Sequence, residues 1–546
     1  MTPAVLLLIL LIPFVYRLYS PTHRHLPAIP LARLTSLPLH AICYLGIEGR
    51  VLRLYHLKYN TKLLLVAPNS VSVSDPAAVR DIYITAGGFP KDDRYRNFNL
   101  GPVVSIFSAI DTEYRDKRAK AVAPLFAPSR LRAASEKDGV IGSSVAEFVD
   151  QFRAFKQAGV KVDIVDLCAR LSIDVVTGYL LGEKYGGLSE HAHFPVESRQ
   201  RQEMKLSANP FIMAIVAFSR FSLLPNWVFK LLYSLSTRLS KNEEVVTSFV
   251  KLDQFTNRVM GNVARPPSSA AKASKESAAS FYQARLLQAG ISPAEAAAQS
   301  KAIVFAGADS TAVMLATILF HLVQNPNARG RLLEEIRASK ENVVAQDPQR
   351  LPYLRAVVKE GLRLGMANPT RLTRVVPASS SAAGFNVDGV HVSPRTVVGC
   401  AAYMLHHDPD VFPEPFAFRP GRWLQNEKEV HIGEKSLDVA NDGKGLYRPE
   451  MDRSMVPFGA GSRACIGKAL AQQQLYEAVF ALVDSEVLED GARTVQERIE
   501  MKEWFNGEIK WHKLEVGPLH RHLQHATLPT SSAPAAMESD HLGEDE

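Results

Sequence analysis

Apolar residues recur at helical spacing along most of the chain, and only a few short runs have the composition of strands. The clearest strand-like runs are KLLLVAP at 62–68 and the region 383–400. Strands do not alternate with crossover helices, and no segment repeats. The pattern therefore predicts one mainly α body with small β-sheets.

The N-terminal segment departs from this pattern. Residues 1–16 are apolar and uncharged, and cationic residues follow from Arg17 onward. A cleaved signal peptide usually carries positive charge before its apolar run and small residues at a cleavage site after it. The opposite order predicts an uncleaved membrane anchor over 1–20, in contact with membrane lipid and with the rest of the chain on the cytosolic side. A cleaved signal or a buried helix is the alternative.

The rest of the chain divides by composition. A proline-punctuated connector is expected over 21–40, a folded body over 41–520 and a disordered acidic tail over 521–546. Residues 264–280 have the composition either of a linker between domains or of a long surface loop. Helical patterns on both sides of this stretch favour a loop within one body.

Charge and cysteine content exclude several classes of protein. The 546 residues carry a net charge of +7 with Lys and Arg scattered, so nucleic-acid binding is not indicated. The four cysteines, Cys43, Cys168, Cys400 and Cys465, are far apart and indicate neither a disulfide framework nor a zinc cluster. Cys465 alone lies in a glycine-containing loop before a helix. That loop is either a tight turn with an incidental small residue or a site that holds a thiolate for a metal.

A long helix is expected to begin at the capping box SPAE (292–295), which places proline at the first helical position. No helix-ending signal follows until the Asn-Pro pair at 325–326, which gives about 32 residues. The centre of this helix is apolar on every side and should be buried. Asp309, Ser310 and Thr311 are costly in such a place, which favours a functional site over a simple kink in the helix.

Further motifs follow this helix in a fixed order. Glu360 and Arg363 stand three residues apart, and arginines lie beside proline turns in RLTRVVP (371–377) and FAFRPGRWL (416–424). The loop FGAGSRACIG (458–467) comes last. In this order the motifs resemble those of the cytochrome P-450 superfamily of haem-thiolate monooxygenases, of the membrane-anchored microsomal type. The loop matches the family pattern F-x-x-G-x-R-x-C-x-G at every defined position, and the resemblance covers nearly the whole chain.

The resemblance implies haem b (iron protoporphyrin IX) bound between the long central helix and the cysteine loop, in a haem-binding monooxygenase domain over 41–520. It makes Cys465 the thiolate ligand of the iron. The other residues that it implies at the haem are Phe458, Gly467, Arg463, Arg374, Arg118 and Tyr114. The resemblance also assigns Asp309, Ser310 and Thr311 to the delivery of protons to dioxygen, and Glu360, Arg363 and Arg422 to a buried structural network. Cys43, Cys168 and Cys400 are expected to be packing residues.

The chain departs from the family pattern in three places. Gly421 stands where the family more often has glutamate, and Ser310 stands where threonine is usual. Serine keeps the hydroxyl, and the adjacent Thr311 leaves the role shared between the two. The spacing from Tyr114 and Arg118 to Pro124 is one residue longer than the family pattern, which puts the assignment of Arg118 in doubt.

The implied activity is insertion of one oxygen atom of O2 into a bulky hydrophobic small molecule, in secondary metabolism and at the endoplasmic reticulum membrane. Electrons would come from NADPH through a reductase. Arg115, Lys117 and Lys120 are candidates for a basic face that binds it, and an ordinary solvated helix is the default interpretation of such charges. The alternatives are a reductase-independent haem-thiolate isomerase or dehydratase, and a haem-based binding or sensor module. The apolar residues expected along the substrate are Phe98, Phe107, Ile303, Val304, Phe305, Val375, Val376, Trp504 and Phe505.

Overall fold

The computed structural model describes residues 23–99, 101–193, 195–196, 206–239, 242–264, 281–340, 347–378, 385–424, 447–489 and 491–518. The expected membrane anchor over 1–20, the expected tail over 521–546 and nearly all of the expected loop over 264–280 lie outside these residues.

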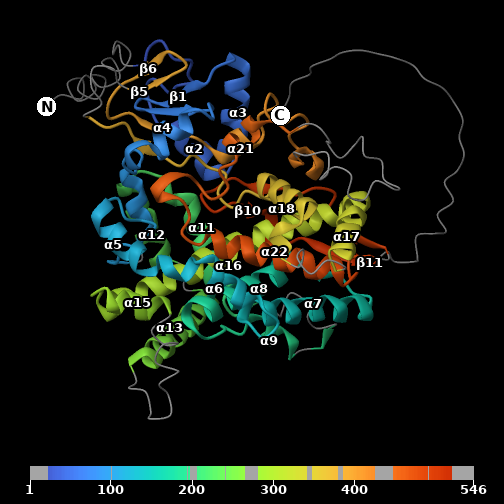
Figure 1. Cartoon of the computed structure of the whole chain (residues 1–546). Helices are drawn as coiled ribbons and strands as arrows, with labels where there is room; N and C mark the ends of the chain where they lie inside the picture. Colours follow the sequence, from blue (N-terminus) through green and yellow to red (C-terminus); the bar gives the residue numbers. More distant parts are fainter. Residues whose placement is uncertain are drawn as a thin grey trace, which may run out of the picture.

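Helices form most of the described chain (Figure 1). The α-helices are α2 (Leu37–Leu45), α3 (Glu48–Tyr59), α4 (Ala78–Tyr83), α5 (Thr112–Val122), α6 (Pro128–Ser135), α7 (Val140–Ala158), α8 (Ile164–Leu181), α9 (Gly187–Ala192), α11 (Asn209–Ser222), α12 (Asn226–Leu239), α13 (Glu243–Ala264), α15 (Tyr282–Gln288), α16 (Pro293–Gln324), α17 (Pro326–Lys340), α18 (Pro352–Leu364), α19 (Ala402–His406), α21 (Pro449–Ser454) and α22 (Lys468–Asp484). The mainly α fold class is confirmed.

The strands are short and form four small sheets. They are β1 (Leu63–Ala67), β2 (Ser70–Val73), β3 (Val162–Asp163), β4 (Arg374–Val375), β5 (Phe385–Val387), β6 (Val390–Val392), β7 (Val397–Gly399), β8 (Ala492–Thr494), β9 (Met501–Lys502), β10 (Glu508–Ile509) and β11 (Glu515–Pro518). The largest sheet has the order β1-β2-β7-β4, with β2 and β7 parallel and the other pairs antiparallel. The others are the three-stranded β3-β11-β8 and the hairpins β5-β6 and β9-β10. Both strand-like runs of the sequence lie in or beside these sheets.

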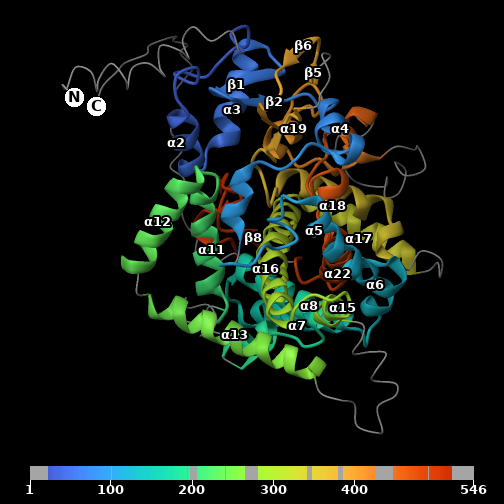
Figure 2. The same cartoon turned by 90° about the vertical axis from the view of Figure 1, so that its left-hand side faces the viewer.

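The long helix α16 runs through the centre of the helical part of the molecule (Figure 2). Ser292 caps its first turn by accepting a hydrogen bond from the backbone N–H of Glu295. The helix ends before Pro326, as expected from the sequence. Among the described residues it is the one helix long and apolar enough to cross a membrane. Its most apolar window is 72% buried inside the protein.

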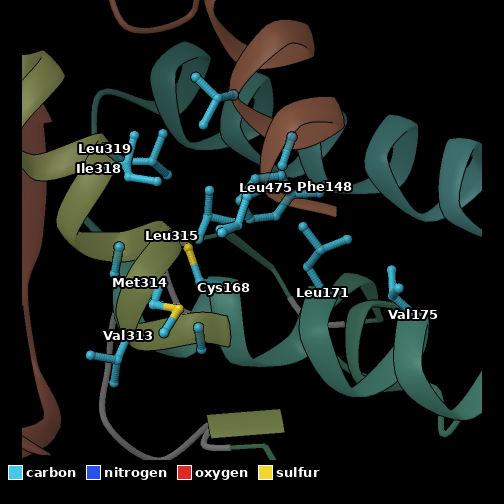
Figure 3. Packing of buried hydrophobic residues seen from close by; sticks show 14 of the residues in the cluster. Phe148, Cys168, Leu171, Val175, Val313, Met314, Leu315, Ile318, Leu319 and Leu475 are labelled. Carbon is cyan, nitrogen blue, oxygen red and sulfur yellow. The ribbon is translucent and has the colours of Figure 1, made fainter. Parts of the chain in front are cut away.

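The core forms where α16 packs against α8, with α7 and α22 close by (Figure 3). The two central helices approach closely because Gly307 has no side chain, and a Cβ there would lie 2.7 Å from a methyl group of Val176. Cys168 of α8 points into this apolar layer beside Leu315 (Figure 3). Each large side chain buried here contributes about 1.5–3 kcal/mol of transfer free energy, which holds α16 in one position.

The connector belongs structurally to the folded body from His23 onward. Leu26, Ile29 and Ala32 are buried, and the backbone of Ile29 bonds to Leu65 of β1. Helix α2 crosses the expected boundary between residues 40 and 41. The proline-rich composition of the connector therefore belongs to a segment that packs on the sheet. Its apolar residues are buried against β1.

Behind the cysteine loop, the expected network of Glu360, Arg363 and Arg422 is present and fully buried. Arg363 donates from Nη2 and Nε to the two oxygens of Glu360 at 2.8 and 2.9 Å, and Arg422 donates to Oε1 at 3.1 Å. Trp423 adds a bond from its indole N–H to Oε2 at 2.9 Å. The buried carboxylate is thus saturated with donors, which a buried charge requires. The glycine at position 421 leaves this network intact.

Candidate active site

A large cavity lies between α16 and the loop over 458–467. Its volume is about 1730 Å³. From α16 it is lined by Ile303, Phe305, Ala306, Gly307, Ser310 and Thr311, and from the loop by Phe458, Arg463, Cys465 and Gly467. The arrangement matches the expectation of a cofactor held between a long central helix and a cysteine loop.

The loop is fixed by tight backbone contacts. The backbone N–H of Cys465 donates to the carbonyl of Phe458 at 2.8 Å, which closes the turn. Gly461 has φ +70°, and a Cβ at this position would lie 1.7 Å from the carbonyl oxygen of Tyr83. Only glycine fits that close approach, so the glycine pattern of the motif has a direct steric cause.

Cys465 is exposed because its side chain opens into the cavity, while protein surrounds it on the other sides. This surrounding burial raises the pKa of the thiol, and backbone N–H groups of Gly467 and Lys468, at the start of α22, act to lower it. Sulfur is therefore presented to the cavity at a helix N-terminus, where a thiolate is favoured.

The other three cysteines occupy a different environment. Cys43, Cys168 and Cys400 are buried in apolar clusters, and burial raises the pKa of each thiol, that of Cys400 to about 12. They are packing residues, as the sequence predicted.

Among the cationic side chains that line the cavity, four form one interacting group around Lys91. Arg374 and Arg463, both expected, line the cavity together with Lys91 and Arg115. Arg463 is aimed by bonds to the carbonyls of Ala109 and Ile110 at 2.9 and 3.0 Å.

These cations repel one another. Burial lowers the pKa of Lys91 well below its ordinary value, and the charges of Arg374, Arg463 and Arg115 lower it further. Burial and the charge of Arg115 also lower the pKa of Arg463. An anionic group in the cavity would relieve this repulsion. The two propionates of haem have the required charge, and the Cys465 sulfur is the ligand that its iron needs, so the residues present fit haem.

Two residues expected at the haem make their side-chain contacts elsewhere in the structure. Within the described part of the chain, Tyr114 and Arg118 are not among the residues that line the cavity. Arg118 pairs instead with Glu295 of α16 at 2.5 Å, and the Tyr114 hydroxyl donates to the same carboxylate at 2.8 Å. Arg115 of the same helix takes the place facing the cavity. The sequence did not predict Lys91 at the cavity, because a single lysine after a proline belongs to no recognisable motif.

The side chains of the polar residues at the centre of α16 point to different sides of the helix. Ser310 and Thr311 line the cavity, and the Ser310 hydroxyl donates to the carbonyl of Ala306 at 2.6 Å. Asp309 is buried and points elsewhere, with its Oδ1 3.8 Å from Nε2 of His512. Burial raises the pKa of Asp309, and the charge of His512 acts to lower it. The three residues thus reach from the cavity to a second polar group on the far side of the helix.

An aromatic wall of Phe98, Phe107 and Phe505 lines part of the cavity. The ring of Phe505 lies 4.4 Å from Phe98 and 5.3 Å from Phe107, centroid to centroid. Ile303 and Phe305 also line the cavity, as expected. Four other residues expected along the substrate are not among the described residues that line the cavity: Val304, Val375, Val376 and Trp504. Trp504 packs toward the N-terminal helices instead, with its indole N–H bonded to the carbonyl of Tyr44.

Comparison with known proteins agrees with this geometry. A family model of cytochrome P-450 matches residues 52–484. The chain is 61% identical over 515 residues to the cytochrome P-450 monooxygenase mfmF of Annulohypoxylon moriforme. The matched region covers 94% of this chain and 98% of that protein. It is 28% identical to the cytochrome P-450 monooxygenase oblB of Aspergillus clavatus, over 86% of each chain. It is 25% identical to a trichothecene C-4 hydroxylase of Trichoderma arundinaceum, over 77% of each chain. With its cysteine loop, its central helix and a family match over most of its length, this chain belongs to the cytochrome P-450 family of haem-dependent monooxygenases.

Proposed function

We propose that this monooxygenase inserts one oxygen atom of O2 into a bulky, mostly apolar small molecule of secondary metabolism. The observation that carries the proposal is the cavity of about 1730 Å³, which is lined both by the thiol of Cys465 and by the aromatic wall of Phe98, Phe107 and Phe505. Aromatic walls favour large apolar ligands. The relatives named above, one of them a trichothecene hydroxylase, agree with such a substrate class.

Haem ligated by a thiolate supplies the activation of dioxygen when it is bound. In this chain, Cys465 would hold the iron, Phe458 and Gly467 would lie beside the sulfur, and Arg374 and Arg463 would hold the propionates together with Lys91 and Arg115. Electrons would come from NADPH through a reductase. Lys117 and Lys120, exposed on α5, support an acidic partner there, whereas Arg115 faces the cavity.

Proton delivery would run through the polar turn of α16. Asp309 would take up a proton on its buried side, and Ser310 and Thr311 would pass it into the cavity that they line. The rival interpretation is a helix kink, in which the Ser310 hydroxyl only satisfies the carbonyl of Ala306.

The membrane assignment rests on the sequence of residues 1–20 and on one surface feature. Trp227 and Leu231 of α12 are 72% and 61% exposed, which is unusual for large apolar side chains and suits contact with lipid. In microsomes, protease should digest the folded body without detergent. Protection of residues 40–546 inside intact vesicles would contradict a cytosolic body at the endoplasmic reticulum membrane.

The function is tested with the purified holoenzyme, NADPH and a reductase. A library of apolar metabolites is first screened for compounds that shift the spin state of the haem. Compounds that bind should then be oxygenated with consumption of NADPH, and product formation without NADPH would indicate an isomerase or dehydratase instead.

The proton path is tested with the same assay in four proteins: wild type, Ser310→Ala, Thr311→Ala and the double variant. The double variant should release hydrogen peroxide in place of product and should be worse than either single change, because the hydroxyls share one task. A wild-type ratio of product to NADPH in the double variant would favour the kink.

A further inference from the structure

His512 lies on the side of α16 that faces away from the cavity. It lies in a 3-10 turn over Lys510–His512 that directly follows β10. This turn, near the C-terminal end of the described chain, places His512 beside Asp309. Its Nε2 lies 3.8 Å from Oδ1 of Asp309, slightly beyond a hydrogen bond. Among the described residues, neither that Oδ1 nor Nδ1 of His512 has a hydrogen-bond partner. Asp309 therefore turns an unpartnered oxygen toward Nε2 of His512, and the other ring nitrogen of His512, Nδ1, is also unpartnered.

The backbone that carries His512 is held in an unfavourable conformation. Trp511 and His512 have φ of 65° and 49°, in the left-handed region that non-glycine residues rarely adopt, and here two such residues are consecutive. The turn sends Trp511 outward, 80% exposed, and His512 inward, with 11% of its side chain exposed. Strain of this kind persists where the surrounding structure requires the placement of a side chain.

Three carboxylates interact electrostatically with the imidazole. Besides Asp309 of α16, it acts on Asp163 of β3 and on Glu508 of β10. Burial raises the pKa of all three carboxyl groups, that of Asp163 to about 6, and the charge of His512 acts to lower each of them.

Cations also face this cluster. The charges of Arg220 of α11 and Lys502 of β9 act against burial, in the direction that lowers the pKa of Glu508. Glu508 is partly exposed, so the cluster reaches from the protein surface to the buried Asp309. A proton path through this cluster would reach α16 without crossing the cavity.

We propose that His512 is the proton donor that reprotonates Asp309 from solvent. The step transfers one proton from Nε2 to Oδ1 after a small side-chain movement closes the 3.8 Å gap, and solvent then returns one proton to the imidazole. No electron moves in this step. The inference rests on the proposed role of Asp309 in proton delivery, and it adds the residue that supplies Asp309. It also accounts for the strained turn, which holds the ring between solvent and α16.

The test compares His512→Asn with Asp309→Asn in the holoenzyme with its reductase. Asparagine tolerates the left-handed conformation but cannot carry a proton at this position. NADPH-driven oxygen consumption should fall roughly 10- to 100-fold in both variants, near the lower end of the effect of general acid–base groups. The double variant should be no slower than Asp309→Asn, because the two residues act in series. His512→Gly, which is unstrained in the same turn, should reproduce the loss if His512→Asn folds poorly.

A second measurement does not depend on turnover. In the resting ferric protein, the carbonyl stretch of protonated Asp309 is assigned by infrared difference against Asp309→Asn, with ¹³C-labelled aspartate. His512→Asn should increase the protonated fraction of Asp309 at a given pH, because the opposing positive charge is gone. Trp511→Gly is the matched control from the same turn and should leave both the infrared band and oxygen consumption unchanged.

The outcomes separate the two ideas. Normal oxygen consumption in Asp309→Asn would overturn the proposed proton path itself. A slow Asp309→Asn with a normal His512→Asn would overturn only the role of His512. An Asp309 band that does not respond to His512→Asn would also overturn that role, because it would show that the two groups are not coupled.

Discussion

Arg118 of α5 forms a two-pronged ion pair with Glu295 in the first turn of α16, with Nε–Oε1 at 2.5 Å and Nη2–Oε2 at 2.9 Å. The Arg118 guanidinium also lies 3.2 Å from the centre of the Tyr114 ring. The acidic side chain lies at the helix N-terminus, where negative charge is favourable. This contact fixes α5 to the central helix, and it explains why Arg118 does not reach the cavity.

Glu295→Gln should therefore lower the free energy of unfolding by about 1–3 kcal/mol at neutral pH, between the effects of exposed and buried ion pairs. The hydrogen bond from Arg118 lowers the pKa of Glu295, so its contribution is present above the pKa of the unfolded chain and is lost as pH falls through the folded value. Urea unfolding followed by circular dichroism at several pH values measures this. Glu113→Gln, an exposed acid of α5, is the control, and equal losses in both variants would contradict the prediction.

Arg115 and Arg118 should have separate effects on haem. Arg115→Gln removes one of the cations that line the cavity and should speed transfer of haem to apomyoglobin roughly tenfold, the effect of one charge-assisted hydrogen bond. Arg118→Gln should lower stability and leave the rate of transfer nearly unchanged. Faster haem loss in Arg118→Gln than in Arg115→Gln would restore the assignment made from the sequence.

The sequence predicted the parts of the site that local chemistry determines. The glycines around Cys465 and the capping box at Ser292 act on their own neighbourhood, so their patterns were sufficient. Arg115 and Arg118 stand three residues apart on one helix and point in similar directions. Glu295 decides which of them faces the cavity, and that partner comes from a distant helix.

Lys91 could not be predicted for a related reason. It reaches the cavity because an isolated bridge places it beside Arg374, from a distant part of the chain. His512 likewise meets Asp309 only through the pairing of β11 with β3, which brings the C-terminal segment back to α8 and α16. Residues that the tertiary structure brings together leave no local pattern in the sequence.

Two glycines of the cysteine loop allow the effect of backbone conformation to be distinguished from the effect of a close steric contact. Gly459 and Gly461 have φ of +69° and +70°, so alanine is strained at both by about 1–2 kcal/mol. At Gly459 the nearest atom to an added Cβ is 3.5 Å away, whereas at Gly461 it is the Tyr83 carbonyl at 1.7 Å. Gly459→Ala should retain haem with reduced stability, and Gly461→Ala should lose haem or fail to fold. Absorbance of purified protein at the Soret band decides this, and equal behaviour of the two variants would contradict the steric argument.

His406 should make the protein sensitive to mild acid. Its Nδ1 lies 3.1 Å from the carbonyl of Arg363, and its Nε2 accepts the backbone N–H of Val456 at 3.0 Å, so the ring is neutral. Burial lowers its pKa to about 3 from 6.5. The unfolded chain therefore binds the extra proton first, and stability is lost as pH falls below 6.5, by up to ~1.4 kcal/mol per pH unit.

His406→Gln removes this titration. Its stability should change less between pH 6.5 and pH 5 than that of wild type, by about 2 kcal/mol, even if the variant is less stable at pH 7. Urea unfolding at three pH values gives the slope. His25→Gln, at an exposed position of the connector, is the control. A slope for His406→Gln as steep as that of wild type would show that other groups cause the acid sensitivity.

Cys465 should differ from the other cysteines in both reactivity and spectrum. Its thiol opens into the cavity, whereas Cys43, Cys168 and Cys400 are buried in apolar clusters. In haem-free protein, iodoacetamide should therefore label Cys465 first, and bound haem should block that labelling, as read by mass spectrometry. Cys465→Ala should lose the red-shifted Soret band of the ferrous–carbonyl complex. The other three cysteine-to-alanine variants should keep it and lose only about 0.5–3 kcal/mol of stability from their packing. A thiolate spectrum in Cys465→Ala, or equal labelling of all four thiols, would remove Cys465 from its place at the iron.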